Sequence, residues 1–192
     1  MVAFLVRVWL VVVKYPLTVI LDLLIYEPLR RKATPAFDAW STAATAAGPA
    51  AVAAAVRERV SYLADPLGGA LDFVQTPAVT WARRAGDCDD FAYLAAELFT
   101  RSGRAAWLVH YAAWNLVDSH VVCLWAERRG EFGVFDQGDL RPGFPTLQAA
   151  AAAGAPADVK IAATVVQRYG RGGDLVGRWL GRPRRRDPRE RI

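Results

Sequence analysis

The stretch Arg84-Ala-Gly-Asp-Cys-Asp-Asp-Phe-Ala-Tyr-Leu-Ala-Ala96 places a cysteine, Cys88, where a glycine turn gives way to an apolar helical pattern. From Cys88 onward, apolar residues recur three and four positions apart, which is typical of one face of an amphipathic helix. Gly103 is a typical C-terminal stop for such a helix. A thiol at a helix N-terminus meets the positive end of the helix dipole, which favours the thiolate. The stretch therefore predicts a reactive cysteine at the start of a helix.

Two features downstream supply the partners that a thiol nucleophile needs. His120 opens a strand-like run at 119–125, and Asp136 ends another at 132–136, with a hairpin-like segment between them. Neighbouring antiparallel strands can bring the two side chains together on one face. Cysteine, histidine and acid then have the roles of nucleophile, base and orienting residue.

Other residues compete for these roles. Asp118 and Asp139 are alternative acids, and His110, in a strand-like run at 105–111, is an alternative base. We favour His120 because only this histidine is followed closely by a strand that ends in an acid. Cys123 lies in an apolar strand three residues after His120, so it projects to the opposite sheet face and is expected to pack in the core. For that reason no disulfide with Cys88 is expected.

The segment Gly86-Asp87-Cys88-Asp89-Asp90-Phe91-Ala92 resembles the signature of the bacterial transglutaminase-like cysteine proteinases, in the transglutaminase-like superfamily with its papain-like arrangement. Thr76-Pro77-Ala-Val-Thr-Trp81 is similar to the lead-in helix of that family. The resemblance covers roughly residues 50 to 140. It implies that Cys88 is the nucleophile, His120 the base and Asp136 the acid. One departure is that the family acid is usually followed by proline or asparagine, whereas Gln137-Gly138 follows Asp136 here.

The acids beside Cys88 have two interpretations. In some relatives the residues that flank the cysteine are implicated in calcium binding, so the resemblance implies a calcium site at Asp87 and Asp89. We favour the other interpretation, helix capping, because carboxylates in the first turn suit the positive helix end, so no metal is expected to be required. We expect no other cofactor. Gln75, in the preceding loop, is a candidate donor for an oxyanion.

Length and pattern predict an α+β fold, and the resemblance implies that its core is papain-like and transglutaminase-like. A chain of 192 residues that is 54% hydrophobic can form one domain with appendages. Helices are expected up to residue 64, with starts at Thr34-Pro35 and Pro49, followed by a loop at 65–75. The remaining elements are the Cys88 helix packed on an antiparallel sheet, with strands near 105–112, 119–127, 132–136 and 159–167, and an alanine helix from Pro145. We place this domain at residues 33–170.

The N-terminal segment, residues 1–32, is expected to be an apolar anchor or docking helix. Its first 26 residues are apolar except for Arg7, Lys14, Thr18 and Asp22, which fall on one narrow stripe of a helix. Those charges interrupt every long apolar run, which disfavours a membrane span, and no cleavable signal peptide is recognised. The helix could lie in a membrane interface, bind a partner protein or pack on its own domain. The chain is thus expected at a membrane periphery or in a larger assembly.

The C-terminal tail, residues 171–192, carries the basicity of the chain. It has eight arginines and three acids, a net charge of +5 that equals the charge of the whole chain. We expect either a solvated end or a segment that binds an anionic partner. Aromatic and basic residues are not interleaved, so sequence-specific nucleic-acid binding is not expected.

Together these features predict thiol-dependent acyl transfer on an amide bond of a protein or peptide substrate. Hydrolysis is the default outcome, since nothing in the sequence indicates a dedicated amine site. The opposing hypothesis is a structural or assembly subunit, of a membrane complex or a phage particle, that keeps the fold without the activity.

Overall fold

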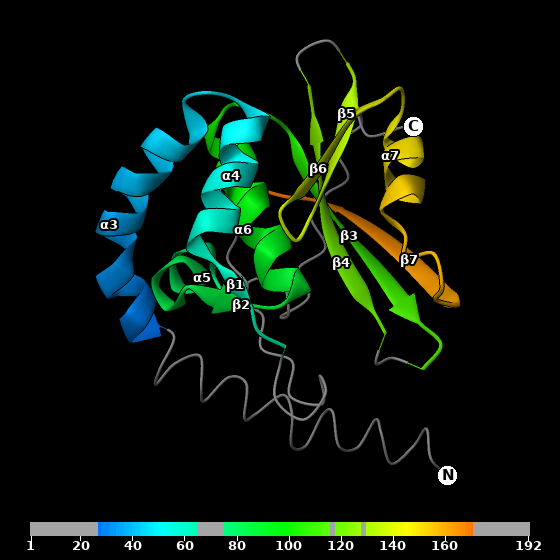
Figure 1. Cartoon of the computed structure of the whole chain (residues 1–192), viewed down its shortest axis with the longest axis horizontal. Coiled ribbons are helices and arrows are strands. Elements are labelled where there is room, and N and C mark those ends of the chain that lie inside the picture. Colours follow the sequence, from blue (N-terminus) through cyan, green and yellow to red (C-terminus); the bar gives the residue numbers. More distant parts are fainter. Residues whose placement is uncertain (1–26, 65–74, 116–117, 128–129, 171–192) are drawn as a thin grey trace.

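The computed structural model describes residues 27–64, 75–115, 118–127 and 130–170. In this part of the chain, four helices lie on one side of a five-stranded antiparallel sheet and one short helix covers the other side (Figure 1). The fold is therefore α+β, as the sequence predicted. The helices are α3 (Glu27–Thr45), α4 (Pro49–Arg59), α5 (Pro77–Arg83), α6 (Cys88–Arg101) and α7 (Leu147–Gly154).

The sheet has the strand order β6-β5-β4-β3-β7, and each neighbouring pair is antiparallel. Four of its strands confirm the sequence prediction, whereas β6 was not predicted because Pro142 and Gly143 are typical of a loop. A proline is tolerated there because β6 is an edge strand. The strands are β3 (Ala106–Ala113), β4 (His120–Ala126), β5 (Phe132–Asp136), β6 (Asp139–Phe144) and β7 (Ile161–Arg168).

A further pair of short strands precedes the Cys88 helix. β1 (Ser61–Tyr62) and β2 (Ala85–Gly86) form a parallel ladder of two residues each. This ladder fixes the chain that follows α4 beside the turn that leads into α6. It therefore connects the end of α4 to the residues immediately before Cys88.

α6 is the central helix of the core. All of its residues from Asp89 to Phe99 are buried, as expected for a helix enclosed by its neighbours. Phe99 stacks on Trp125 of β4 with ring centroids 4.7 Å apart. Gly133 of β5 lies under the same indole, where a Cβ would be 2.1 Å from a ring atom. The opposite sheet face has a smaller core under α7, which includes Val109, Tyr111, Val122, Leu124, Val134 and Ala150.

α3 begins earlier than the sequence indicated. The predicted helix start at Thr34-Pro35 is wrong, because α3 begins at Glu27 and contains Pro35. Glu27 forms ion pairs with Arg30 at 2.6 Å and with Arg31 at 2.7 Å, and such pairs one turn apart stabilise a helix start. The second predicted start is confirmed, since Pro49 is the first residue of α4.

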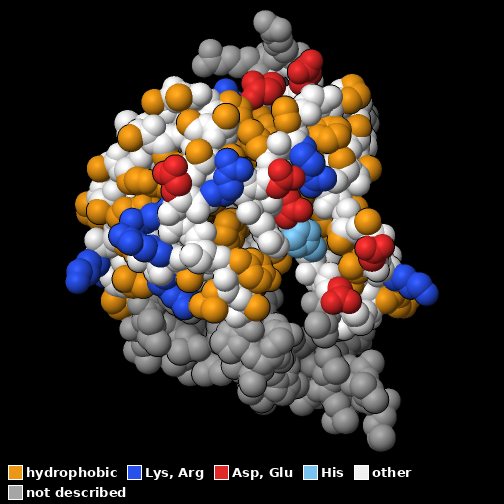
Figure 2. Space-filling model, in the orientation of Figure 1, with side chains coloured by type: hydrophobic (Ala, Val, Ile, Leu, Met, Phe, Trp, Pro, Cys, Tyr) orange, Lys and Arg blue, Asp and Glu red, His pale blue; other side chains and the backbone are white. Residues whose placement is uncertain are grey.

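Several predictions fall on segments outside the described residues. The apolar segment 1–26 and the basic tail 171–192 lie there, so both partner predictions stay untested, as does the division at 32/33 and 170/171. Among the described residues, none of the helices combines the length and the apolar character that a membrane crossing requires. On the face shown in Figure 2, basic side chains predominate over the helical half, whereas basic and acidic side chains are mixed over the strands.

Candidate active site

The start of α6 is held by a capping box. Asp87 is the N-cap residue, and its carboxylate accepts the backbone N–H of Asp89 at 3.2 Å and that of Asp90. In return, the Asp90 carboxylate accepts the backbone N–H of Asp87 at 3.4 Å. Gly86 permits this close approach, because a Cβ there would be 2.5 Å from the Asp90 side chain. Cys88 is thus the first residue of a helix whose N-terminal turn is fixed on both sides.

The capping box leaves one backbone donor of this turn available. The N–H groups of Asp87, Asp89 and Asp90 donate to the two capping carboxylates, and that of Phe91 donates to the Asp87 carbonyl at 3.1 Å. In the described part of the chain, the backbone N–H of Cys88 has no such partner. The free donor therefore belongs to the residue that carries the thiol.

Gln75 secures the same helix start from the preceding loop. Its backbone N–H donates to Asp90 Oδ1 at 2.8 Å, and its side-chain amide donates to Asp90 Oδ2. The side-chain nitrogen also lies 3.5 Å from the carbonyl oxygen of Ala85. The amide donors of Gln75 are thus used within the fold, which argues against the predicted role as an oxyanion donor. Its role here is to donate hydrogen bonds to Asp90, a fully buried carboxylate, which lowers the free-energy cost of burying that group.

His120 lies between an acid and the Cys88 thiol. β4 and β5 pair with Cys123 opposite Phe135, which brings the start of β4 to the end of β5. His120 Nε2 is 2.8 Å from Asp136 Oδ1, and Cys88 is close enough to the same imidazole to raise its pKa. Asp136 and then Cys88 raise the pKa of His120 from its usual 6.5 to about 9, although partial burial opposes the rise. The structure thus places the predicted base beside the predicted acid, and Cys88 acts on the same imidazole.

Two further side chains surround Asp136, and the sequence did not predict them. Arg141 of β6 places Nη2 at 3.6 Å from Asp136 Oδ2 and donates through Nη1 to the Ala153 carbonyl of α7 at 2.7 Å. Tyr111 of β3 donates its hydroxyl to the Ala151 carbonyl. Burial, and then the negative charge of Asp136, raises the pKa of Tyr111 to about 12. The end of α7 is thereby attached to the residues around the acid.

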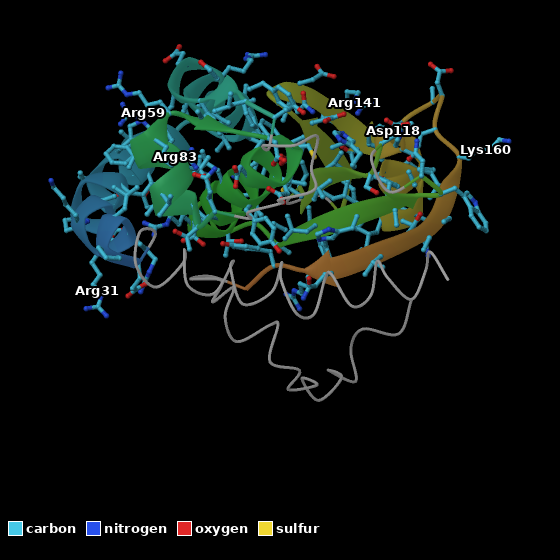
Figure 3. The ribbon with its side chains drawn as sticks, turned by 90° about the horizontal axis from the view of Figure 1, so that it is seen from below. Arg31, Arg59, Arg83, Asp118, Arg141 and Lys160 are labelled. Atoms are coloured by element: carbon cyan, nitrogen blue, oxygen red, sulfur yellow. The ribbon has the colours of Figure 1, made fainter. Side chains whose placement is uncertain are left out.

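The competing residues make other contacts. The Asp118 carboxylate accepts a hydrogen bond from the side-chain nitrogen of Asn115 at 2.6 Å. Figure 3 shows Asp118 in the same half of the molecule as Lys160. Asp139 is exposed and lies 3.4 Å from Arg141 Nε. His110 is in the middle of β3, opposite Val121 and Val165. The predicted core position of Cys123 is confirmed, because its side chain is fully buried and burial raises the pKa of its thiol well above the usual range.

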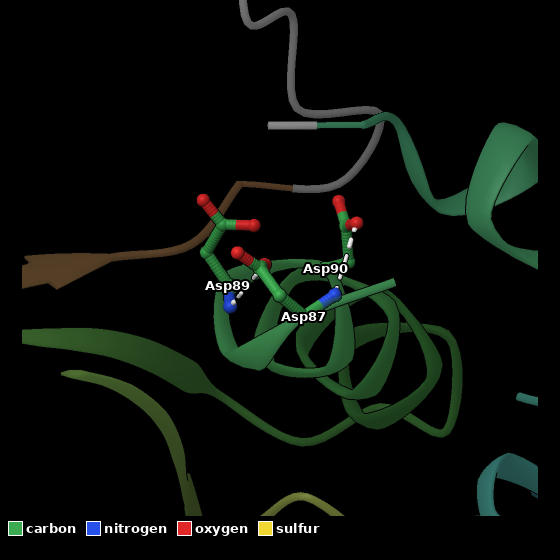
Figure 4. A group of neighbouring side chains, drawn as sticks. All are labelled: Asp87, Asp89 and Asp90. Carbon is green, nitrogen blue, oxygen red and sulfur yellow. Dashed lines mark hydrogen bonds between the residues drawn. The ribbon is translucent and has the colours of Figure 1, made fainter. Parts of the chain in front are cut away.

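The three aspartates at the start of α6 form a compact acidic group (Figure 4). Each offers a carboxylate oxygen, and these oxygens lie within 4.8 Å of one another. Oxygen ligands of this kind suit a hard divalent cation such as Ca²⁺. The side-chain oxygen of Gln75 is buried nearby and accepts no hydrogen bond in the part of the chain that the structure describes. Capping accounts for much of this arrangement, but the donor set also fits a calcium ion.

Comparisons with known proteins give a coarse likeness in fold only. No family model matches the sequence, and no curated protein does. Among solved structures, LapG of Legionella pneumophila is similar at 19% identity, with a TM-score of 0.48 over 79% of this chain and 86% of that one. Calcium-bound LapG aligns at 19% identity and a TM-score of 0.47, over 77% and 84% of the two chains. A candidate cysteine protease from Cytophaga hutchinsonii aligns at 20% identity and a TM-score of 0.37, over 78% and 53%.

Proposed function

We propose that the chain is a transglutaminase-like cysteine peptidase that hydrolyses a peptide or amide bond through Cys88, His120 and Asp136. The observation that supports this proposal is the position of His120, whose Nε2 lies 2.8 Å from Asp136 Oδ1 and whose pKa is raised by both Asp136 and Cys88. A nucleophile, a base and a residue that orients the base are the parts that acyl transfer needs. The proposal takes one of these parts from each of three elements, α6, β4 and β5.

The chemistry begins with the charge state of the pair. With a pKa of about 9, the imidazole of His120 is protonated at neutral pH, and the mechanism uses the thiolate form of Cys88 as the nucleophile. The thiolate attacks the carbonyl carbon, forming a C–S bond and an oxyanion. The oxyanion is stabilised by the backbone N–H of Cys88, the donor that the capping box leaves free.

Collapse of this intermediate breaks the C–N bond, and the imidazolium of His120 gives its proton to the leaving amine. His120 then takes a proton from water, whose oxygen attacks the thioester. The C–S bond breaks, the acid is released, and the thiolate and imidazolium are restored. Asp136 keeps the imidazole oriented and stabilises its charged form throughout.

Calcium is part of the proposal. Asp87 and Asp89 would hold the ion, with Asp90 and the buried oxygen of Gln75 beside them. A cation there offsets the negative charge of carboxylates close to the thiolate and stiffens the start of α6. The ion takes no part in the proton transfers, which belong to His120.

The first test compares the two thiols in one protein. Iodoacetamide should label Cys88 rapidly at neutral pH, whereas Cys123 should stay unlabelled until the protein unfolds, because it is fully buried. His120→Ala should slow the labelling of Cys88, since the imidazolium that favours the thiolate is gone. Equal and slow labelling of both cysteines in the native protein would rule out an activated thiol.

The second test concerns turnover. Cys88→Ala and His120→Ala should each abolish hydrolysis of a mixed peptide library, while each variant keeps a cooperative melting transition that shows it is folded. His110→Ala is the matched control, because it removes the other histidine of the chain, and it should leave kcat largely intact. Loss of turnover in His110→Ala alone would move the base to His110. A wild-type protein that cleaves no peptide would favour the structural or assembly subunit.

A further inference from the structure

The last turn of α4 lies between two turns with unusual backbone geometry. Arg84 and Gln137 are the only residues other than glycine that have a positive φ in the described part of the chain, at 58° and 47°. Arg84 lies four residues before Cys88, and Gln137 directly follows Asp136. Residues other than glycine rarely adopt this left-handed backbone conformation, and those that do are concentrated at functional sites. Strained turns therefore flank the candidate site on both sides.

Arg57, at the end of α4, lies against the second of these turns. A Cβ on Gly138 would be 2.3 Å from Arg57 Cγ and 2.9 Å from Arg57 Cδ, so the methylene groups of the arginine cover this glycine. The contact holds the guanidinium beside the turn that follows Asp136. Arg57 is exposed, and among the described residues its guanidinium has neither an ion pair nor a hydrogen bond. Arg57 thus has packed methylene groups and a guanidinium without a partner among the described residues. Arg141 differs, because it is paired with two aspartates.

Arg59 and Arg84 lie at the first turn. Arg59 Nε donates to the Trp81 carbonyl at 3.0 Å, and its guanidinium stacks over the Trp81 ring, 4.2 Å from the centroid. Burial, and then the positive charge of Arg84, lowers the pKa of Arg59, so the two arginines are close enough to repel each other. Figure 3 shows Arg59 in the helical half of the molecule, away from Arg141. In the described part of the chain, neither Arg59 nor Arg84 forms an ion pair with a carboxylate.

We propose that Arg57, Arg59 and Arg84 form a cationic rim that binds acidic side chains of the polypeptide substrate next to the scissile bond. Guanidinium groups bind carboxylates through paired hydrogen bonds. The three arginines have no carboxylate partner among the described residues, and Arg59 and Arg84 repel each other, so an anion that binds between them is stabilised. The carboxylates of Asp87 and Asp90 oppose this only weakly, because they accept the N–H donors of the helix start. The inference rests on the proposed function, since it names the substrate class of that same site.

The field of the cationic rim can be measured at the thiol itself. Iodoacetate is anionic and iodoacetamide is neutral, so the ratio of their rate constants at Cys88 reports the local potential. In the full-length protein at low salt, Arg57→Gln with Arg84→Asn should lower this ratio about two-fold for each charge removed, and added salt should shrink the effect. Arg57→Lys with Arg84→Lys should keep the ratio. Arg31→Gln, an exposed arginine on α3 that pairs with Glu27, is the matched control.

Substrate preference is the second readout. Two peptidyl vinyl sulfones with the same reactive end, one flanked by two aspartates and one by two lysines, should label Cys88 at different rates. The aspartate probe should be several-fold faster in the wild type, and the rim variants should lose that preference. Equal rates for both probes in the wild type would overturn the proposal, as would an iodoacetate ratio that falls equally in the Arg31 control. Charge-selective labelling without peptide hydrolysis would refute the peptidase assignment but not the cationic rim. Hydrolysis without a charge preference would refute the cationic rim but not the peptidase assignment.

Discussion

Replacing Asp136 by asparagine should lower the pKa of His120. The bond to Asp136 is the first cause of the rise from 6.5 to about 9, and the bond to Cys88 is the second. That rise corresponds to about 3 kcal/mol of preference for the imidazolium, since each pKa unit is worth about 1.4 kcal/mol. An opposite charge within a few ångströms typically accounts for a change of about 1 to 3 in pKa. We therefore expect the pKa of His120 to fall by about that amount in Asp136→Asn.

Proton NMR can follow this change directly. The chain has two histidines, so the imidazole region holds two resonances, and His110→Gln assigns them. Asp139→Asn is a matched control, because Asp139 lies across the same turn from Asp136 but pairs with Arg141. It should leave the titration of His120 nearly unchanged. A wild-type pKa near 6.5, or an equal fall in both variants, would refute the reasoning.

The same shift predicts how stability depends on pH. The folded-state pKa of His120 lies above its unfolded value, so its contribution is fully present below pH 6.5 and is lost as the pH rises through about 9. The side chain is 18% exposed, so solvent screening leaves most of the contribution, up to about 3 kcal/mol in total. Urea unfolding at pH 6 and at pH 9.5 should show this loss in the wild type and a smaller one in Asp136→Asn. Equal losses in the two proteins would contradict the assignment.

Three further predictions concern the surroundings of the site. Calcium added to EGTA-treated protein should raise the melting temperature, and Asp89→Asn should abolish the rise; an unchanged wild-type melting temperature would exclude the calcium site. Gly154→Ala should destabilise the protein by about 1 to 3 kcal/mol in guanidinium unfolding, because the new Cβ would lie 2.9 Å from the Tyr111 hydroxyl and 3.0 Å from Val122; no loss would show that α7 can shift freely. Deleting residues 1–26 should keep a cooperative melting transition, because the buried residues of α3 begin at Ala33; loss of cooperativity would make that segment part of the core.

The sequence predicted the elements whose patterns are local. The α6 helix follows from apolar residues at helical spacing, and β4 and β5 follow from short apolar runs bounded by polar turns. The meeting of His120 with Asp136 could be predicted because a hairpin joins their strands. When two antiparallel strands are joined by a short hairpin, their pairing register can be predicted from the pattern of apolar and polar residues. The position of Cys88 relative to that hairpin needed the resemblance to a known family as well.

The contacts that were missed join residues with no common pattern. Gln75 and Asp90 are held together across a loop, so nothing in the spacing of the two residues indicates the bond. Arg141 was missed for another reason. β6 contains a proline and a glycine, so the sequence did not predict a strand there and could not indicate on which side of the sheet Arg141 lies. Arg57 gave no signal, since an exposed arginine at a helix end is common. Its relation to Gly138 exists only in the folded chain.

The geometry at Cys88 shows how the same residues can serve both stability and chemistry. A helix start leaves several N–H donors without partners, and a protein gains stability by satisfying them. Here two aspartates satisfy every donor of the first turn except that of Cys88. Burying the Asp90 carboxylate costs free energy, which its three N–H donors offset, and two of those come from Gln75. The cap thus fixes the cysteine backbone and leaves its N–H without a partner in the described part of the chain. A cap built from one uncharged side chain would leave more donors free and the thiol less firmly placed.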